Sequence, residues 1–319
     1  MTKAVVARAA GGPEVLEYTD VSPRSLESGE LRVRVSAAGV NFIDTYQRSG
    51  LYSVPLPAVL GLEGAGEVVE SASPDFAVGD RVAWMSSLGS YAAEAIVSAS
   101  VAVPVPSGVD DETAAAALLQ GVTAHYLLHS TFSVSSGQTV LVHAAAGGMG
   151  LLLTQWATAL GARVIGTAST DEKADLARAA GATDVFKYGD FAGAVRSVTD
   201  GRGVDVVYDG VGKDTFDGSL ASLRPRGLLA LYGAASGPVP PFDLQRLNQS
   251  GGLFVTRPST VWYTQTRDEL EWRARDVYAA IADGTLSIRV GGRYKLEEAR
   301  QAHEDLEGRR TTGKLLLVP

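Results

Sequence analysis

A glycine-rich stretch in the middle of the chain, Ala145-Ala146-Gly147-Gly148-Met149-Gly150, has residue types and spacing that suit phosphate binding. The apolar run 139–145 indicates a strand, and residues 149–160 have a helical pattern. Glycine at 147 would let the backbone approach a pyrophosphate on the helix N-terminus, and glycine at 150 would let helix and strand pack closely. The pattern predicts a dinucleotide-binding turn, with a turn that only packs as the alternative. The expected cofactor contacts are Ala146, Gly147, Gly148, Met149 and Gly150.

The end of the next predicted strand, residues 163–168, indicates which dinucleotide is bound. An NAD site usually has a carboxylate there, which accepts a hydrogen bond from the ribose 2′-hydroxyl. Here no acidic residue occurs before Asp171, and Ser169, Thr170 and Lys173 offer hydroxyls and a cation instead. These groups suit a 2′-phosphate, so we expect NADPH. The alternative for Lys173 is a solvated lysine on a helix surface.

Strands and helices alternate on both sides of this turn. Further strands are expected at 163–168, 184–188, 204–210, 227–233 and 253–257, and helices at 171–180, 190–199 and 215–223. Strands that alternate with helices of this length are typical of right-handed crossovers. They predict a doubly wound parallel sheet of the α/β class.

The first third of the chain has short alternating strands separated by glycine-containing turns. Strands are expected at 3–7, 30–37, 66–70, 80–84 and 91–97, which indicates a β-rich partial barrel. The acidic cluster Asp110-Asp111-Glu112 then favours the start of a helix that continues through Leu128.

The C-terminal elements are too few for a domain of their own. They comprise a helix at 264–283, a strand near 289–296, a short helix and a strand at 315–318, and we place them against the barrel. The 319 residues therefore divide into a domain formed by 1–121 plus 259–319 and a cofactor-binding domain of 122–258. Two domains agree with roughly 150 residues per domain.

The overall composition excludes several classes of protein. The chain has no cysteine, so disulfides, thiolate metal ligands and a cysteine nucleophile are excluded. A net charge of −8 leaves no broad basic face for nucleic acid. Residues 113–162 contain no Asp, Glu, Lys or Arg, but polar side chains interrupt the run, so we interpret it as buried interior and not as a membrane span. The N-terminus lacks an apolar signal core, and we expect a cytoplasmic protein.

Three other motif-like patterns do not meet the requirements of their chemistry. His125 and His129 are spaced i, i+4, but a metalloprotease needs a glutamate where Tyr126 stands, so we expect structural or solvent-facing histidines. Residues 308–314 have the spacing of a P-loop, but Leu315 replaces its Ser or Thr. The chain also lacks a Tyr-x-x-x-Lys pair and a Gly-x-Ser-x-Gly elbow, which excludes short-chain dehydrogenase and serine hydrolase chemistry.

Several motifs together resemble a known family. Gly137-Gln138, Leu141, the stretch 144–150 and Gln155 resemble the signature of the zinc-independent quinone oxidoreductase and zeta-crystallin branch of the medium-chain dehydrogenases/reductases. Thr158 departs from the signature, which has Lys, Arg or Ser there. The resemblance extends over essentially the whole chain, through residues 38–44, 50–52, 61–66, 121–124 and 312–319. It implies a Rossmann domain plus a β-rich, GroES-like partial-barrel domain.

The resemblance also bears on metal binding. In zinc-dependent relatives, a cysteine precedes the neighbourhood of Asp44, and a histidine precedes the glutamate of a Gly-His-Glu motif. Here these places look like Asn41 or its neighbours and Leu62, ahead of Glu63, and the cysteine-rich structural zinc lobe is missing. We therefore expect an enzyme without a metal.

The resemblance implies further site residues. Asn41, Tyr46 and Tyr52 would be catalytic, because a tyrosine can donate a hydrogen bond to a quinone oxygen; loop packing is the alternative for the two tyrosines. Arg310 and Lys314 would be cations near the 2′-phosphate or the rim of the cleft, with a surface ion pair as the alternative for Arg310. The implied cofactor contacts are Asn41, Thr123, Tyr188, Gly233, Ala234, Ala235, Leu253, Phe254 and Val255.

The function implied by the resemblance is hydride transfer from NADPH to a quinone bound between the two domains near Tyr46 and Tyr52. Two alternatives stay open: a reductase of α,β-unsaturated ketones or enoyl thioesters, and a non-catalytic NADPH-binding protein. We expect a homodimer, because the resemblance implies one and because residues 253–257 would form an apolar edge strand that needs covering. Neither nucleic acid nor a membrane is expected as a partner.

Overall fold

The structure is a computed structural model that describes all 319 residues, and it divides into two units. The first unit comprises Met1–Gly121, Thr266–Ala282 and Ile288–Pro319, and the second comprises Val122–Gln265 and Asp283–Ser287. Relative to the boundaries expected from the sequence, residues 259–265 and 283–287 fall in the second unit.

Local contacts explain this assignment of the two short segments. The Tyr263 ring stacks on the Tyr126 ring, with centroids 4.3 Å apart. The side-chain amide of Gln155 exchanges two hydrogen bonds with the backbone of Ser287, at 2.7 and 3.3 Å. These contacts hold residues 259–265 and 283–287 against the helical residues Tyr126 and Gln155 of the second unit.

The first unit is built mainly from antiparallel strands. Its strands are β1 (Thr2–Ala7), β2 (Leu16–Val21), β3 (Glu30–Val40), β4 (Ala58–Val59), β5 (Glu63–Ser71), β6 (Arg81–Trp84), β7 (Glu94–Ser98), β8 (Ala102–Pro104), β15 (Val290–Lys295) and β16 (Lys314–Val318). Its helices are α1 (Phe42–Ser49), the first part of α2 (Asp111–Tyr126), α9 (Arg267–Ala282) and α10 (Ala299–Glu307), with short helical segments at Pro13–Val15, Ala99–Val101 and Leu296–Glu298.

The strands of the first unit form two sheets around one core. The larger sheet has the order β15-β16-β3-β5-β6-β8, with β7 also paired to β3, and the smaller has the order β2-β1-β4. Alternate residues of β3, Leu31, Val33 and Val35, are buried in a cluster with Trp84 and Tyr91, as expected for a strand with one buried face. Strand β16 pairs antiparallel with β3, so C-terminal residues complete the N-terminal sheet.

The second unit alternates strands and helices. Its strands are β9 (Thr139–Val142), β10 (Arg163–Thr167), β11 (Asp184–Phe186), β12 (Val204–Asp209), β13 (Leu223–Leu231) and β14 (Phe254–Thr256). Its helices are the second part of α2, α3 (Gly148–Ala159), α4 (Asp171–Ala179), α5 (Phe191–Val198), α6 (Phe216–Ser222), α7 (Gln245–Gln249) and α8 (Thr260–Tyr263), with a π-helical segment at Leu127–Thr131.

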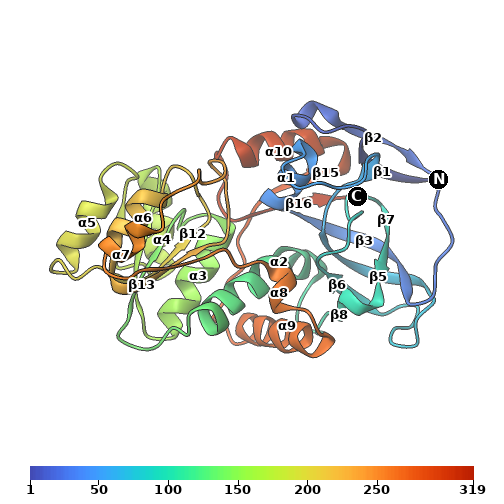
Figure 1. The fold of residues 1–319 in the computed structure, drawn as a ribbon. Helices are drawn as coiled ribbons and strands as arrows, with labels where there is room; N and C mark the ends of the chain where they lie inside the picture. The colour runs from blue at the N-terminus through green and yellow to red at the C-terminus, as the bar shows by residue number, and fades with distance from the viewer. The chain divides into compact units, whose positions relative to one another are not determined.

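All six strands of the second unit are parallel, in the order β11-β10-β9-β12-β13-β14. This confirms the doubly wound sheet expected from the sequence. The chain moves from β9 through β10 to β11, and then returns to the other side of β9 to form β12, β13 and β14. Right-handed crossovers in these two directions put α3 and α4 on one face of the sheet and α5 and α6 on the other, in agreement with the packing of α3 on α4 and of α5 on α6. Figure 1 labels these helices around β12 and β13. In such sheets, ligands bind outside the carboxyl ends of the strands where the direction reverses, here between β9 and β12.

The apolar run 113–162 forms α2, the π-helical segment, β9 and α3, whose residues are mostly buried. No helix has the length and apolar character needed to cross a membrane. Strand β9 ends at Val142, three residues before the expected end, because the chain leaves the sheet at His143 and Ala144 has a left-handed φ of 50°. Strands β2, β4 and β8 and helices α1, α7 and α8 were not predicted from the sequence.

Candidate cofactor and active site

The glycine-rich turn leads directly into the N-terminus of α3. Gly147 is the N-cap residue, in an extended conformation with φ −75° and ψ 170°, and no side chain caps the helix. Its N–H donates to the carbonyl oxygen of Ala144 at 2.8 Å. The first N–H groups of a helix have no partner within the helix, so this end is suited to an anion.

Gly150 is required by the packing of the turn against α3. A Cβ atom at this position would lie 2.2 Å from the Ala144 carbonyl oxygen and 2.6 Å from the Cα of Ala145. At Gly147 the corresponding distance to the Ala144 oxygen is 3.2 Å. A turn of alanines and glycines before an uncapped helix fits a pyrophosphate, and this fit rests on the geometry of the chain itself.

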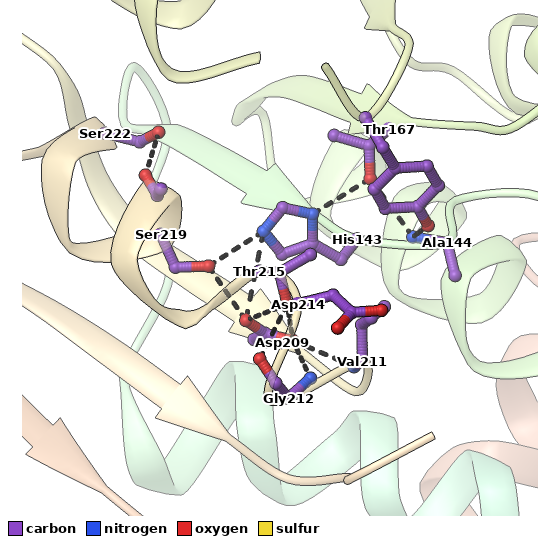
Figure 2. Close-up of polar contacts among 12 residues, drawn as sticks. His143, Ala144, Thr167, Asp209, Val211, Gly212, Asp214, Thr215, Ser219 and Ser222 are labelled. Carbon is purple, nitrogen blue, oxygen red and sulfur yellow. Dashed lines mark hydrogen bonds and ion pairs between the residues drawn. The ribbon is translucent and has the colours of Figure 1, made fainter. Parts of the chain in front are cut away.

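Three adjacent strands end in buried polar side chains beside this turn. His143, Thr167 and Asp209 follow or end β9, β10 and β12, and all three are fully buried (Figure 2). The His143 ring lies with Nδ1 2.9 Å from Thr167 Oγ1 and Nε2 2.9 Å from Ser219 Oγ of α6. This network was not predicted from the sequence, because His143 lies within an apolar run that indicates one strand.

The carboxyl group of Asp209 accepts hydrogen bonds from four donor groups. These are the N–H groups of Val211 and Gly212 at 2.8 and 2.9 Å, the Thr215 hydroxyl at 2.8 Å and the Ser219 hydroxyl at 2.8 Å. Because Ser219 donates its proton to Asp209 and is itself fully buried, it is not a nucleophile activated by His143.

His143 is held in its neutral form. Burial lowers the pKa of its imidazole below the ordinary 6.5, while the negative charge of Asp209, 4.0 Å from Nε2, opposes that shift. Its ring also lies nearly parallel to that of Tyr188, with centroids 6.3 Å apart.

The residues expected at the 2′-phosphate lie at the beginning of α4. Thr170 is the N-cap residue, and its hydroxyl accepts a hydrogen bond from the N–H of Lys173 at 3.2 Å. Ser169 and Thr170 are exposed. The first carboxylate after β10, Asp171, forms an ion pair with Lys187 at 2.7 Å. This end of the site therefore presents hydroxyl groups beside a paired carboxylate.

Other expected cofactor residues lie at the same edge of the sheet. Tyr188 follows β11, and its hydroxyl oxygen accepts a hydrogen bond from the N–H of Ala144 at 3.0 Å. Gly233, Ala234 and Ala235 follow β13, where the N–H of Ala235 donates to the Gly210 oxygen at 3.1 Å. The carboxyl ends of these parallel strands meet at the edge that carries the glycine-rich turn.

Leu253, Phe254 and Val255 are not brought to this edge. Strand β14 is separated from β9 by two strands, and Phe254 lies opposite Leu228, three residues before the carboxyl end of β13. Leu253 is buried in the core, and Phe254 is 59% exposed on the outermost strand. Thr123 lies in α2, with its hydroxyl oxygen 3.4 Å from that of Thr260. The cofactor contacts implied for these four residues stay predictions.

In the first unit, the side-chain amide of Asn41 is buried and forms hydrogen bonds with groups of the same unit. Its Nδ2 donates to Glu63 Oε2 at 2.9 Å and to the Gly39 oxygen at 3.3 Å, and its Oδ1 accepts from Lys314 Nζ at 2.7 Å. Lys314 also pairs with Glu63, and their side chains are 1% and 0% exposed. Both amide protons of Asn41 are therefore used within the unit.

This burial corrects one expectation from the sequence. Lys314 was expected near the 2′-phosphate or the cleft rim, but its ammonium is bound to Glu63 and Asn41 and is inaccessible to a phosphate. Arg310 pairs with Asp305 at 2.7 Å on the surface, which is the alternative left open for it. A cofactor contact of Arg310 stays a prediction.

Tyr46 and Tyr52 form an aromatic pair at helix α1. Their ring centroids lie 5.3 Å apart in an edge-to-face arrangement, and the N–H of Tyr52 donates to the Tyr46 carbonyl oxygen at 3.0 Å. Tyr52 is 40% exposed. The structure thus brings the two expected catalytic tyrosines together.

A buried polar cluster positions α1, which carries Tyr46. Asp44 Oδ2 accepts from the Asn41 N–H and from the Tyr91 hydroxyl, both at 2.8 Å, and the Tyr91 oxygen lies 3.1 Å from His303 Nε2. His303 Nδ1 lies 3.2 Å from Arg48, whose guanidinium pairs with a surface glutamate of α10. Burial raises the pKa of Asp44 to about 6 and lowers that of His303 to about 3. No local sequence pattern indicates this cluster, because its members are far apart in the chain.

His125 and His129 lie side by side, with ring centroids 4.6 Å apart, and both pack edge-to-face on Trp156. No group of three or more His, Asp or Glu side chains with metal-binding geometry occurs in the chain.

Two protein families match parts of this chain. The family described as "Alcohol dehydrogenase GroES-like domain" matches residues 27–107, and "Zinc-binding dehydrogenase" matches residues 148–267. The quinone oxidoreductase of Pseudomonas aeruginosa is 48% identical over 325 residues, which cover 100% of both chains. The chain belongs to the quinone oxidoreductase family. Its first unit therefore contains the GroES-like domain, and its second has the Rossmann-type sheet of the medium-chain dehydrogenases/reductases.

Two further members of the family bear on chemistry. A mycobacterial protein solved as a complex with NADPH has a TM-score of 0.98 and 52% identity, with 100% of both chains covered. The 2-haloacrylate reductase of a Burkholderia species is 43% identical and covers 100% of this chain and 99% of its own. The family thus includes reductases of different electron-poor compounds.

Proposed function

We propose that this chain is an NADPH-dependent quinone reductase that works without a metal ion. The observation that carries the proposal is the turn of alanines and glycines at the uncapped N-terminus of α3, at the point where the strand order reverses. The full-length relative named quinone oxidoreductase and the relative solved with NADPH support the same substrate and cofactor.

Each part of the cofactor has residues suited to it. Backbone N–H groups of residues 147–150 bind the pyrophosphate, and Ser169, Thr170 and Lys173 bind the 2′-phosphate. When bound, NADPH supplies the hydride. The carboxylate nearest to the end of β10, Asp171, is paired with Lys187 and therefore repels a 2′-phosphate less than an unpaired carboxylate would.

The residues of the first unit hold and polarise the quinone. The aromatic rings of Tyr46 and Tyr52 provide an apolar surface, and their hydroxyl groups donate hydrogen bonds to the quinone oxygens, where negative charge develops. The Lys314–Glu63 pair fixes the side chain of Asn41, which begins the helix that carries Tyr46. Solvent supplies the protons that complete the quinol.

A second candidate function is the reduction of an activated carbon–carbon double bond. It is favoured by the 43% identity to a 2-haloacrylate reductase. The hydride chemistry is the same, because a quinone and a conjugated alkene are both electron-poor acceptors. A non-catalytic NADPH-binding protein is the third possibility.

Titration of the apo-protein with NADPH and NADH tests the choice of cofactor. We expect clearly tighter binding of NADPH, and equal affinities would contradict the assignment.

The substrate is tested by following NADPH oxidation with 1,4-benzoquinone, a cyclic enone and 2-chloroacrylate. The proposal expects the highest kcat/KM with the quinone. A higher value with either alkene supports the second candidate, and binding without turnover supports the third. Activity should survive dialysis against a chelator, and its loss would contradict the metal-free mechanism.

The proposal includes a homodimer formed through β14. This strand is the outer edge of the six-stranded sheet, and Phe254 on it is 59% exposed. An unpaired edge with an exposed aromatic side chain favours pairing with a second copy of the same strand.

A further inference from the structure

A chain of hydrogen bonds runs from the glycine-rich turn to Asp209, and chemistry fixes the direction of every proton in it (Figure 2). A serine hydroxyl has one proton, and that of Ser219 is donated to Asp209 Oδ2 at 2.8 Å. Towards His143 Nε2, 2.9 Å away, Ser219 is therefore the acceptor. The imidazole proton must reside on Nε2.

The other half of the chain follows from the neutral imidazole. With its proton on Nε2, His143 has an acceptor at Nδ1, and the Thr167 hydroxyl donates to it at 2.9 Å. The Thr167 oxygen in turn accepts a hydrogen bond from the N–H of Ala144 at 3.3 Å. All donors thus point in one direction, from Ala144 through Thr167, His143 and Ser219 to Asp209.

The hydrogen-bond chain begins at Ala144, the residue that shapes the turn. Ala144 has a left-handed φ of 50°, and its N–H is shared between the oxygens of Thr167 and Tyr188. Its carbonyl oxygen accepts the N–H of Gly147, the N-cap of α3. The backbone conformation of Ala144, which links these two peptide groups, therefore sets where the first N–H groups of α3 point.

The burial of this network indicates a role beyond packing. His143, Thr167, Asp209 and Ser219 are each fully buried, and apolar residues of similar volume would avoid the cost of desolvating polar groups. A buried polar network in which every member has a partner fixes one conformation.

We propose that His143, Thr167 and Ser219 are positioning residues for the cofactor: through the Ala144 N–H they hold the backbone of Ala144 in the conformation that directs the N–H groups of the turn at the pyrophosphate. They do not touch the cofactor themselves. The inference rests on the proposed binding of NADPH, but its effect on the turn is measurable without any cofactor.

The first test uses the apo-protein. ¹⁵N NMR of the His143 imidazole should show a neutral ring protonated at Nε2, and the Ser219→Ala variant should exchange the amide hydrogen of Ala144 faster than the wild type. An Nδ1-protonated ring or an imidazolium at neutral pH would overturn the proton order. Unchanged exchange in Ser219→Ala would overturn the link to the turn.

The second test measures binding by two probes, NADPH and adenosine 2′-monophosphate, which lacks the pyrophosphate. Ser219→Ala and Thr167→Val should each weaken NADPH about fivefold, the effect of one net hydrogen bond, and leave adenosine 2′-monophosphate within about twofold. The matched control for Ser219 is Ser222→Ala, in the same helix, equally buried and bonded only to the Gly218 oxygen (Figure 2). The control for Thr167 is Thr154→Val, whose buried hydroxyl has no hydrogen-bond partner.

The outcomes separate the inference from the proposed function. A wild type that does not bind NADPH contradicts the proposed function, while the tautomer and the exchange of Ala144 still decide the role of the network. Equal losses in Ser219→Ala and Ser222→Ala, or equal weakening of both probes, would show a structural role only. The two variants lie at opposite ends of His143, so a folding failure of one leaves the other as the test.

Discussion

The ammonium of Lys314 is paired with the carboxylate of Glu63 in the interior of the first unit, and neither side chain is more than 1% exposed. Glu63 also accepts hydrogen bonds from Asn41 Nδ2 and from the Leu119 N–H, at 2.9 and 2.6 Å. This pair thus joins β16, β5 and α2 to Asn41, the residue that begins α1.

Removing one partner of this pair should destabilise the protein strongly. Lys314→Met leaves the charge of Glu63 buried without its cation, and we expect a loss of about 3 to 5 kcal/mol in the free energy of unfolding. The double variant with Glu63→Gln should recover part of the loss, because no uncompensated charge is left. Urea unfolding measures the free energy of unfolding of the single and the double variant. Lys3→Met, in an exposed pair with Asp20, serves as control and should change little.

The stability of the protein should fall below neutral pH because of His303. Its pKa is about 3 in the folded state and 6.5 ordinarily, so the unfolded chain binds a proton that the folded protein excludes. Between about pH 6 and 4 this should lower the free energy of unfolding by about 1.4 kcal/mol per pH unit. His303→Gln should flatten the dependence, measured by urea unfolding at several pH values.

Asp44 provides the opposite sign in the same cluster. Its pKa of about 6, above the ordinary 3.8, means that the folded state binds the proton first, so stability from this group increases as the pH falls from about 6 to 3.8. Asp44→Asn should therefore steepen the loss on acidification. The same pH dependence in both variants and the wild type would contradict the assignment to this cluster.

Gly150→Ala should weaken NADPH binding by about tenfold or more, because its Cβ would overlap the Ala144 carbonyl and displace α3 from the turn. Isothermal titration measures the change. The matched control is Gly189→Ala, in the same unit, where no atom lies within 4 Å of the added Cβ. Wild-type affinity in Gly150→Ala would show that the turn does not bind the pyrophosphate.

Lys173→Ala should weaken NADPH about tenfold and leave NADH unchanged, because only NADPH carries the 2′-phosphate that a charge-assisted hydrogen bond would recognise. Lys187→Ala provides the comparison, since this lysine is already paired with Asp171 at the start of the same helix. A parallel loss of both cofactors in Lys173→Ala would argue against the 2′-phosphate site.

Phe254→Lys should convert the proposed dimer to a monomer, because a charge on an edge strand opposes pairing with another edge. Light scattering on a gel-filtration column reads the mass directly. Val78→Lys changes an equally exposed apolar residue in a turn of the first unit and should not affect association. A monomeric wild type would refute the proposal at once.

The turn and the doubly wound parallel sheet were predictable because they depend on local signals. Glycine spacing between an apolar run and a helical pattern is visible within a dozen residues, and alternating strands and helices indicate right-handed crossovers between parallel strands. The hydroxyl groups before α4 were visible in the sequence in the same way, because Ser169 and Thr170 follow the predicted strand with no acid before Asp171.

The buried polar groups were not predictable in this way. His143 is one polar residue in an apolar run, and its partner Ser219 lies 76 residues further along the chain. Lys314 and Glu63 are separated by 251 residues, and no local pattern distinguishes a buried lysine from an exposed one. Three polar residues near the ends of predicted strands, His143, Thr167 and Asp209, were the available signal for the network at the turn.

The pairing of β16 with β3 has a consequence for the order of events during synthesis. Strands β3 and β16 pair in one sheet, but the ribosome makes the whole of 122–265 after β3 and before β16. The sheet of the second unit uses strands from residues 139–256 only, so it can close while the first unit still lacks β16 and the cation for Glu63. Until Lys314 emerges, the nascent first unit presents an open edge of β3 and an unpaired acid, so it is the half of the protein that stays incomplete longest during translation.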